Sequence, residues 1–111
     1  MIVGAALIEL HVHGSQSLKA KRGVVKSLTA RMRNKFNVAV AEVGGQDTWQ
    51  RAVLGLAAAG SNRVAVRKLL ERACEFIVEL HLAEVRNVDI EVIDLPHDEG
   101  AWDPDDPADG D

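Results

Sequence analysis

Basic side chains are concentrated in one short stretch of this chain. Residues 17–36, SLKAKRGVVKSLTARMRNKF, contain seven lysines and arginines and no acid, and the acid-free region extends from residue 10 to residue 41. A cluster of this kind can neutralise phosphate groups, so the chemistry it suggests is the binding of a polyanion. The cations are Lys19, Lys21, Arg22, Lys26, Arg31, Arg33 and Lys35.

The apolar residues in this stretch recur with the period of a helix, which predicts one amphipathic helix over residues 18–36. Its buried face would carry Leu18, Val25, Leu28, Met32 and Phe36. On a helical wheel the cations line both flanks of an outward strip of small residues. One flank holds Lys19, Arg22, Lys26 and Arg33, the other holds Arg31 and Lys35, and the strip holds Ala20, Gly23, Ser27 and Ala30.

Three of the cations lie in the first turns of this helix, where the helix dipole favours negative charge instead. Together with free backbone N–H groups and the hydroxyls of Ser15 and Ser17, Lys19, Lys21 and Arg22 predict an anion pocket. Lys21 points toward the buried side, so we expect its stem on apolar surface and its ammonium to emerge near the preceding loop. The competing interpretation is a solvated basic face; the first-turn cations favour anion binding.

The net charge of −4 over 111 residues hides a mildly basic body. Eight of the 17 acids lie in residues 94–111, which have no lysine or arginine, so residues 1–93 carry all 13 cations against nine acids. We predict one domain over residues 1–95 and a disordered acidic tail over residues 96–111. The single cysteine, Cys74, predicts a buried inert thiol and excludes an internal disulfide. No leader or membrane-spanning run is recognisable, so we expect a cytoplasmic protein.

The elements that must position the basic helix follow from alternation and turn signals. Period-2 patterns predict four strands, and a second helix begins near Gly60-Ser61. The order β-α-β-β-α-β is the ferredoxin-like arrangement, an α+β fold. It predicts a four-stranded antiparallel sheet of order 4-1-3-2, with both helices on one face. The predicted strands cover residues 2–13, 36–43, 47–58 and 87–95.

The other face of this sheet would be flat, apolar and made of small residues. Exposed, such a surface is sticky, and a second copy packed sheet to sheet is the simplest cover. We therefore predict a homodimer, although a different protein or a small apolar ligand could cover the same face. The predicted dimer face comprises Val3, Ala5, Leu7, Ala39, Ala41, Val43, Val53 and Gly55, with Trp49 at its rim.

Three segments of the chain carry a family resemblance. SLKAKR, RNKFNVAVAEV and QDTWQRA occur in this order, and with them residues 1–95 resemble the YlxP-like family of small bacterial proteins. The resemblance implies a ferredoxin-like fold and no known activity. Genes of this family often lie near those for translation initiation and ribosome maturation, which implies a link to RNA or the ribosome.

Other polar groups give weaker signals. Glu9, His11 and His13 have the spacing of one strand face, which can hold a metal together with a ligand from elsewhere in the chain. The pattern supplies no such additional ligand, so a solvated strand end is favoured over a metal site. Nucleophile-elbow, Walker and GxGxxG patterns are all absent from the sequence. We therefore predict no catalytic residue, metal or cofactor, and the sequence favours binding over catalysis.

The function that we predict is the binding of structured RNA or a ribosomal subunit by phosphate contacts. The chain lacks the aromatic set and motifs that single-strand readers of the RRM and KH types use, so backbone or shape recognition is favoured. The alternative is a homodimeric interaction scaffold whose basic helix meets an acidic protein. A small-molecule-binding dimer is a third possibility, without a pocket signature in the sequence.

Overall fold

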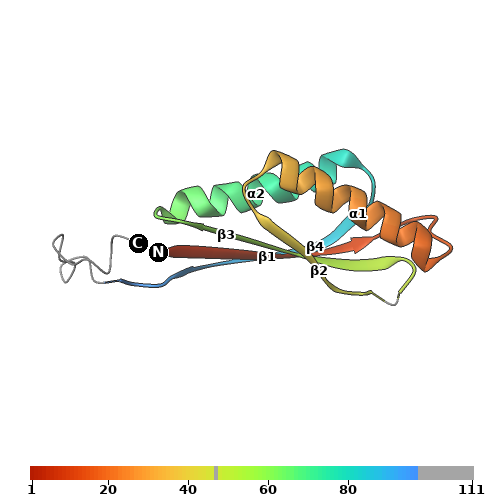
Figure 1. The fold of residues 1–111 in the computed structure, drawn as a ribbon, viewed down its shortest axis with the longest axis horizontal. Helices are drawn as coiled ribbons and strands as arrows, with labels where there is room; N and C mark the ends of the chain where they lie inside the picture. The colour runs from red at the N-terminus through yellow and green to blue at the C-terminus, as the bar shows by residue number, and fades with distance from the viewer. Residues whose placement is uncertain (47, 98–111) are drawn as a thin grey trace, which may run out of the picture.

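The structure of the chain, a computed structural model, describes residues 1–46 and 48–97. It confirms the ferredoxin-like fold: the elements follow the order β-α-β-β-α-β, and the sheet is antiparallel with the order β2-β3-β1-β4. Both helices cover the same face of the sheet (Figure 1). The elements are β1 (Ile2–His11), α1 (Leu18–Lys35), β2 (Ala39–Gly44), β3 (Arg51–Gly60), α2 (Arg63–Leu80) and β4 (Glu84–Asp94).

Strand β1 lies in the middle of the fold and organises the core. Its alternation places Ile2, Ala6, Ile8 and Leu10 beneath the helices, all nearly inaccessible to solvent. Gly4 belongs to the same row and allows α2 to approach closely. A Cβ at this position would lie 2.6 Å from Leu70 Cδ1 and 2.7 Å from Val66 Cγ1, so any larger residue would force these side chains of α2 to shift.

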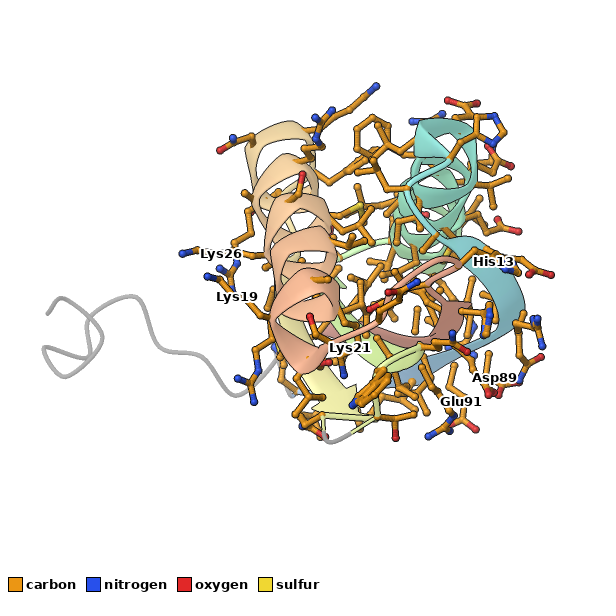
Figure 2. All side chains as sticks on the ribbon, turned by 90° about the vertical axis from the view of Figure 1, so that its right-hand side faces the viewer. His13, Lys19, Lys21, Lys26, Asp89 and Glu91 are labelled. Atoms are coloured by element: carbon orange, nitrogen blue, oxygen red, sulfur yellow. The ribbon has the colours of Figure 1, made fainter. Side chains whose placement is uncertain are left out.

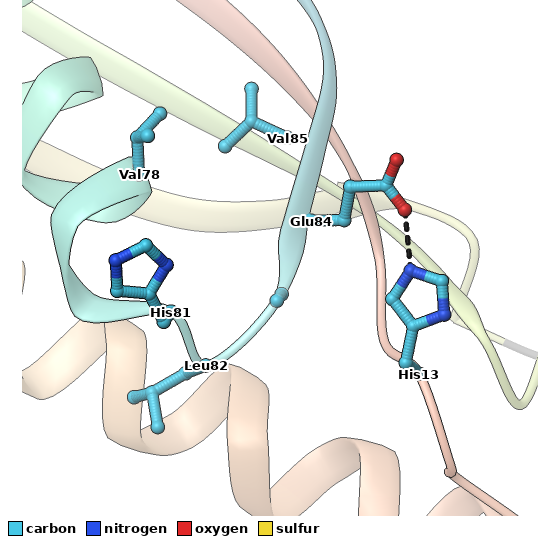
Figure 3. Close-up of a pocket in the computed structure, with 7 residues that line it drawn as sticks. His13, Val78, His81, Leu82, Glu84 and Val85 are labelled. Atoms are coloured by element: carbon cyan, nitrogen blue, oxygen red, sulfur yellow. Dashed lines mark hydrogen bonds and ion pairs between the residues drawn. The ribbon is translucent and has the colours of Figure 1, made fainter.

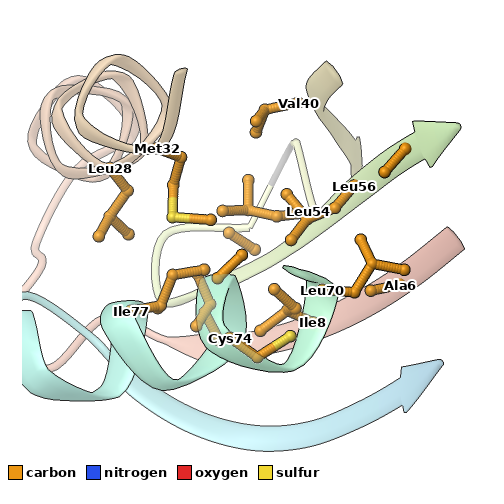
Figure 4. Packing of buried hydrophobic residues seen from close by; sticks show 14 of the residues in the cluster. Ala6, Ile8, Leu28, Met32, Val40, Leu54, Leu56, Leu70, Cys74 and Ile77 are labelled. Carbon is orange, nitrogen blue, oxygen red and sulfur yellow. The ribbon is translucent and has the colours of Figure 1, made fainter. Parts of the chain in front are cut away.

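The two helices close the core over the sheet, as Figure 4 shows. Helix α1 contributes Val25, Leu28 and Met32, and α2 contributes Val66, Leu70, Ala73 and Ile77. Cys74 also lies in this layer, and burial raises the pKa of its thiol to about 11, with a smaller contribution from Glu71 and Glu75. The thiol therefore stays protonated at neutral pH, in agreement with the predicted inert cysteine.

The bounds of all four strands differ from the sequence prediction, and the largest shifts are at the starts of β2, β3 and β4. Strand β3 begins at Arg51, later than predicted, because β2 ends at Gly44 and the hairpin turn starts at Gly45, which has a φ of +75°. Strand β4 begins at Glu84, earlier than predicted, because an irregularity between Glu9 and Leu10 lets β1 pair with it as far as His11.

Two sequence predictions concern the ends and the surroundings of the fold. The predicted tail, residues 96–111, lies outside the described part of the chain after position 97. Neither helix of the described part has the length and apolar character that crossing a bilayer requires.

Candidate anion-binding helix

The two serines before α1 serve the helix itself. Ser17 is the N-cap, and its Oγ accepts a hydrogen bond from the Ala20 backbone N–H at 3.0 Å. Ser15 is buried, and its hydroxyl donates to the Ser17 carbonyl at 3.1 Å. Both hydroxyls therefore have intramolecular partners, and Ser15 is not accessible to a ligand.

Lys21 is the largest departure from the sequence analysis. The expectation that its ammonium emerges near the loop is wrong, since the side chain is 0% exposed. Its Nζ donates to the backbone carbonyl of Gly45 and, at 3.2 Å each, to those of Gln46 and Arg51. The carboxylate of Glu42 lies 3.4 Å from the same atom. An ammonium has three N–H groups, so none is left for a phosphate.

The surroundings of Lys21 explain why a charge is tolerated there. A buried ammonium needs hydrogen bonds and a counter-charge, and the β2–β3 hairpin supplies both. Glu42 Oε2 is itself buried without a hydrogen bond, so its nearest compensation is the charge of Lys21. Lys21 thus fixes the first turns of α1 to the hairpin loop and is a structural residue, not a ligand contact.

The remaining first-turn cations, Lys19 and Arg22, lie on an accessible surface with two cations from later turns. We call this surface the outer flank: Lys19, Arg22, Lys26 and Arg33. Figure 2 shows Lys19 and Lys26 extending from α1 on the side away from α2. Within residues 1–46 and 48–97, no ion pair or hydrogen bond occupies the side chains of Lys19, Arg22 and Lys26. The three residues span about 10 Å along the helix axis.

Arg33 extends the outer flank toward the sheet. Its Nη2 donates to the Val40 carbonyl of the edge strand β2 at 2.7 Å, and the side chain is otherwise exposed. A guanidinium has five N–H donors, so Arg33 can keep this bond and still meet an anion.

The cations of the other flank are partly engaged within the molecule. Arg31 Nε donates to Ser27 Oγ at 3.3 Å. Lys35 Nζ lies 4.4 Å from the centroid of the Phe76 ring of α2, a cation–π contact. The two flanks predicted from the helical wheel are therefore not equivalent, and the outer flank is the more available surface.

Acidic side chains gather on the opposite side of the molecule. Asp89 and Glu91 project from β4, across the sheet from Lys19 and Lys26 (Figure 2). Because β2 and β4 are the two edges of the sheet, the domain has a basic side and an acidic side. This separation is absent from the net charge and appears only in the folded chain.

The strand residues predicted for a dimer share the open face of the sheet. Paired residues of neighbouring strands point to the same face. Leu7 pairs with Gly55, Gly55 pairs with Ala41, and Val43 is 51% exposed next to Gly55. Trp49 precedes β3 and is 55% exposed.

A groove at the end of α2 holds a second group of polar side chains (Figure 3). It has a volume of about 460 Å³, and His13, His81 and Glu84 line it with apolar neighbours. His13 Nε2 hydrogen-bonds Glu84, and this bond, followed by that from Arg86, lowers the pKa of the Glu84 carboxyl. Across the described ranges, no three groups of the metal-binding residue types converge.

The weaker metal candidates from the sequence are engaged in contacts within the protein. Glu9 accepts from Arg51 Nε at 3.1 Å, His13 lies beyond the end of β1, and His11 packs edge-on against the His13 ring. The sequence analysis did not single out the groove residues His81 and Glu84, because they join only after α2 and β4 have folded together.

The fold and the outer flank define a class: a small ferredoxin-like domain with one basic helix flank. Comparison places the chain within a family. It belongs to DUF503, described as a protein of unknown function, which matches residues 3–90. The chain is also similar to the uncharacterized protein YlxP of Bacillus subtilis (strain 168), with 46% identity over 76 residues. This alignment covers 68% of the chain and 83% of that protein.

Proposed function

We propose that this protein binds structured RNA, such as a helical region of ribosomal RNA, through phosphate contacts made by the outer flank of α1. Its action is binding and not turnover, and its place is the cytoplasm, where that RNA is found. The observation that carries the proposal is the row of exposed cations on an acid-free helix, without acidic partners in the described part of the chain.

The shape of the helix supports contact with a nucleic-acid backbone. Gly23 is exposed, and a Cβ built on it would meet nothing within 4 Å. The outward strip of small residues therefore projects little from the helix. A phosphate backbone can approach such a strip while longer basic side chains reach it from the flank. Because the outer flank has four cations, we expect it to neutralise about four phosphates.

The salt dependence of binding tests this assignment directly. We expect the affinity for a structured RNA hairpin to fall with salt with a log–log slope near −3 to −4, at about −0.9 per neutralised phosphate. The triple variant Lys19→Ala, Arg22→Ala, Lys26→Ala should reduce this slope to about −1. The matched control removes three exposed cations from α2, Arg67→Ala, Lys68→Ala, Arg72→Ala, and should keep most of the slope.

Sedimentation of a cell lysate through a density gradient tests the cellular partner. We expect the wild type and the α2 control to travel with a ribosomal subunit at low salt and the α1 triple variant to stay at the top. Equal RNA binding by both triple variants would contradict the role of the outer flank. Co-sedimentation that survives ribonuclease would point instead to an acidic protein partner for the same cations.

A further inference from the structure

The open face of the sheet has a protrusion and a hollow at the same level. Leu7 of β1 is 50% exposed and stands out from its small neighbours. Beside it, β2 and β3 form an apolar hollow of about 270 Å³. The residues at the surface of this hollow are Ala39, Ala41, Val43, Gly55 and Ala57.

Polar groups limit this apolar area on two sides. On β4, Glu91 pairs with Ala5 and Asp89 pairs with Leu7, so both carboxylates project on the open face along one long side. At one end of the strands, the ion pair between Glu9 and Arg51 closes the area with a distance of 3.1 Å. The apolar area is therefore centred on β3 and not on the whole sheet.

We propose that a second copy of this chain covers the open face, with a two-fold axis that runs along β3, parallel to the strands. Rotation about this axis places β1 of one copy over β2 of the other. Leu7 of each copy then enters the hollow of its partner. The interface uses the same patch on both copies, as a two-fold dimer requires.

The charges select this axis over the alternative. An axis across the strands would place Asp89 of one copy over Asp89 of the other and the Glu9–Arg51 end over the apolar end, and both arrangements are unfavourable. The axis along β3 places the Glu9–Arg51 end of one copy over the same end of the other. Arg51 of each copy can then form an ion pair with Glu9 of the other copy. It also places the acidic β4 of each copy beyond the β2 edge of the other, so the two copies of β4 lie on opposite sides of the dimer.

The size of the patch sets the expected strength of the dimer. Strands β1 and β3, of ten residues each, are about 33 Å long and β2, of six residues, is about 20 Å long, so at about 4.8 Å per strand two copies bury on the order of 800 Å² in total. Stable interfaces usually bury at least about 1,200 Å². We therefore expect a dimer that dissociates on dilution in the micromolar range.

Sedimentation equilibrium of the full chain over a range of concentrations tests the interface. We expect a mass that rises toward twice 12.0 kDa for the wild type and at least a ten-fold weaker association for Leu7→Glu. Val78→Glu is the matched control, since Val78 is 48% exposed but lies on α2, and it should associate like the wild type. Ala41→Glu, in the hollow, gives a second disruption if Leu7→Glu fails to fold.

Site-specific cross-linking tests the axis itself. In a Cys74→Ala background, a bismaleimide with a reach of about 10 Å should link Ala57→Cys to itself, because facing sheets lie about 10 Å apart. It should not link Asp89→Cys, because the proposed axis separates the two copies of this position by about 19 Å along the sheet. A monomeric wild type up to about 0.5 mM would overturn the dimer. Linkage of Asp89→Cys without that of Ala57→Cys would overturn the axis.

Discussion

Helices α1 and α2 have the same length of 18 residues and cover the same sheet, yet they use their faces differently. The core side of α2 is made of apolar residues and Cys74, whereas α1 buries a lysine among its apolar residues. On the solvent side, α2 mixes four cations with three acids and α1 carries cations alone. Two helices with equivalent places in the fold therefore share their backbone arrangement but differ in the charges on their surfaces.

The two helices also share two kinds of hydrogen bond, at the N-cap and to an edge strand. Each has an N-cap whose side chain accepts from the N–H three residues later, Ser17 in α1 and Asn62 in α2. Each helix also has one arginine that donates a hydrogen bond to a backbone carbonyl of an edge strand. The buried Lys21 and the outer flank occur in α1 alone, so substitutions there should show the difference.

Replacement of Lys21 should give the largest effect. Lys21→Met leaves Glu42 as a buried charge without a partner, so we expect the free energy of unfolding to fall by about 3 kcal/mol. Arg67→Met on α2 removes an exposed cation and should change it by less than about 0.5 kcal/mol. Urea denaturation followed by circular dichroism measures both.

The double variant Lys21→Met, Glu42→Gln separates charge from packing. It should recover about 1 kcal/mol of the loss, because the buried carboxylate is no longer left unpaired. If the single Lys21→Met variant were as stable as the wild type, the hairpin would not depend on this ammonium. Lys21 would then again be a candidate anion-binding residue.

The two edge arginines should give a smaller effect of similar kind. Arg33 Nη2 reaches the Val40 carbonyl and Arg63 Nη2 reaches the Val92 carbonyl, each at 2.7 Å. We expect each alanine variant to lose about 1 kcal/mol, the loss of one hydrogen bond from a charged donor. Because β2 has six residues and β4 has 11, amide hydrogen exchange should rise more in β2 of Arg33→Ala than in β4 of Arg63→Ala. Equal exchange in the two variants would show that strand length does not govern fraying.

Gly23 should give the smallest change and one of opposite sign. A Cβ at this position meets nothing within 4 Å, so Gly23→Ala should raise the free energy of unfolding by about 0.5–1 kcal/mol. Affinity for an RNA hairpin should stay within about two-fold of the wild type. Gly23→Leu raises the strip between the flanks and should weaken RNA binding, while unchanged affinity would remove the close approach from the proposed mode.

Most of the fold follows from local patterns in the sequence. Alternation in β1 and the helical period of residues 18–36 place the inward residues correctly, since burial of apolar side chains fixes both. The N-cap at Ser17 agrees with the preference of serine for the position before a helix. The β3 boundary does not, because the carbonyls of Gly45 and Gln46 are held by Lys21, which lies more than 20 positions earlier in the chain.

The candidate site was predicted in outline and corrected in detail. The helical wheel separates the two flanks, but it cannot show that α2 lies against Lys35 or that the hairpin encloses Lys21. These outcomes depend on which elements pack together, and a single-helix pattern carries no such information. The carboxylates of Asp89 and Glu91 could have been placed on the open face, because the alternation of β4 assigns them there.

The position of β1 between β3 and β4 has a consequence for synthesis of the chain. Pairing of β1 with β3 needs only the first 60 residues, but pairing with β4 reaches from Ile2 to Asp94. At about 5–20 residues per second, the last strand follows β3 by roughly two to seven seconds. During that interval the newly made chain exposes one side of its central strand, so nascent chains on neighbouring ribosomes could pair through it before their own β4 arrives.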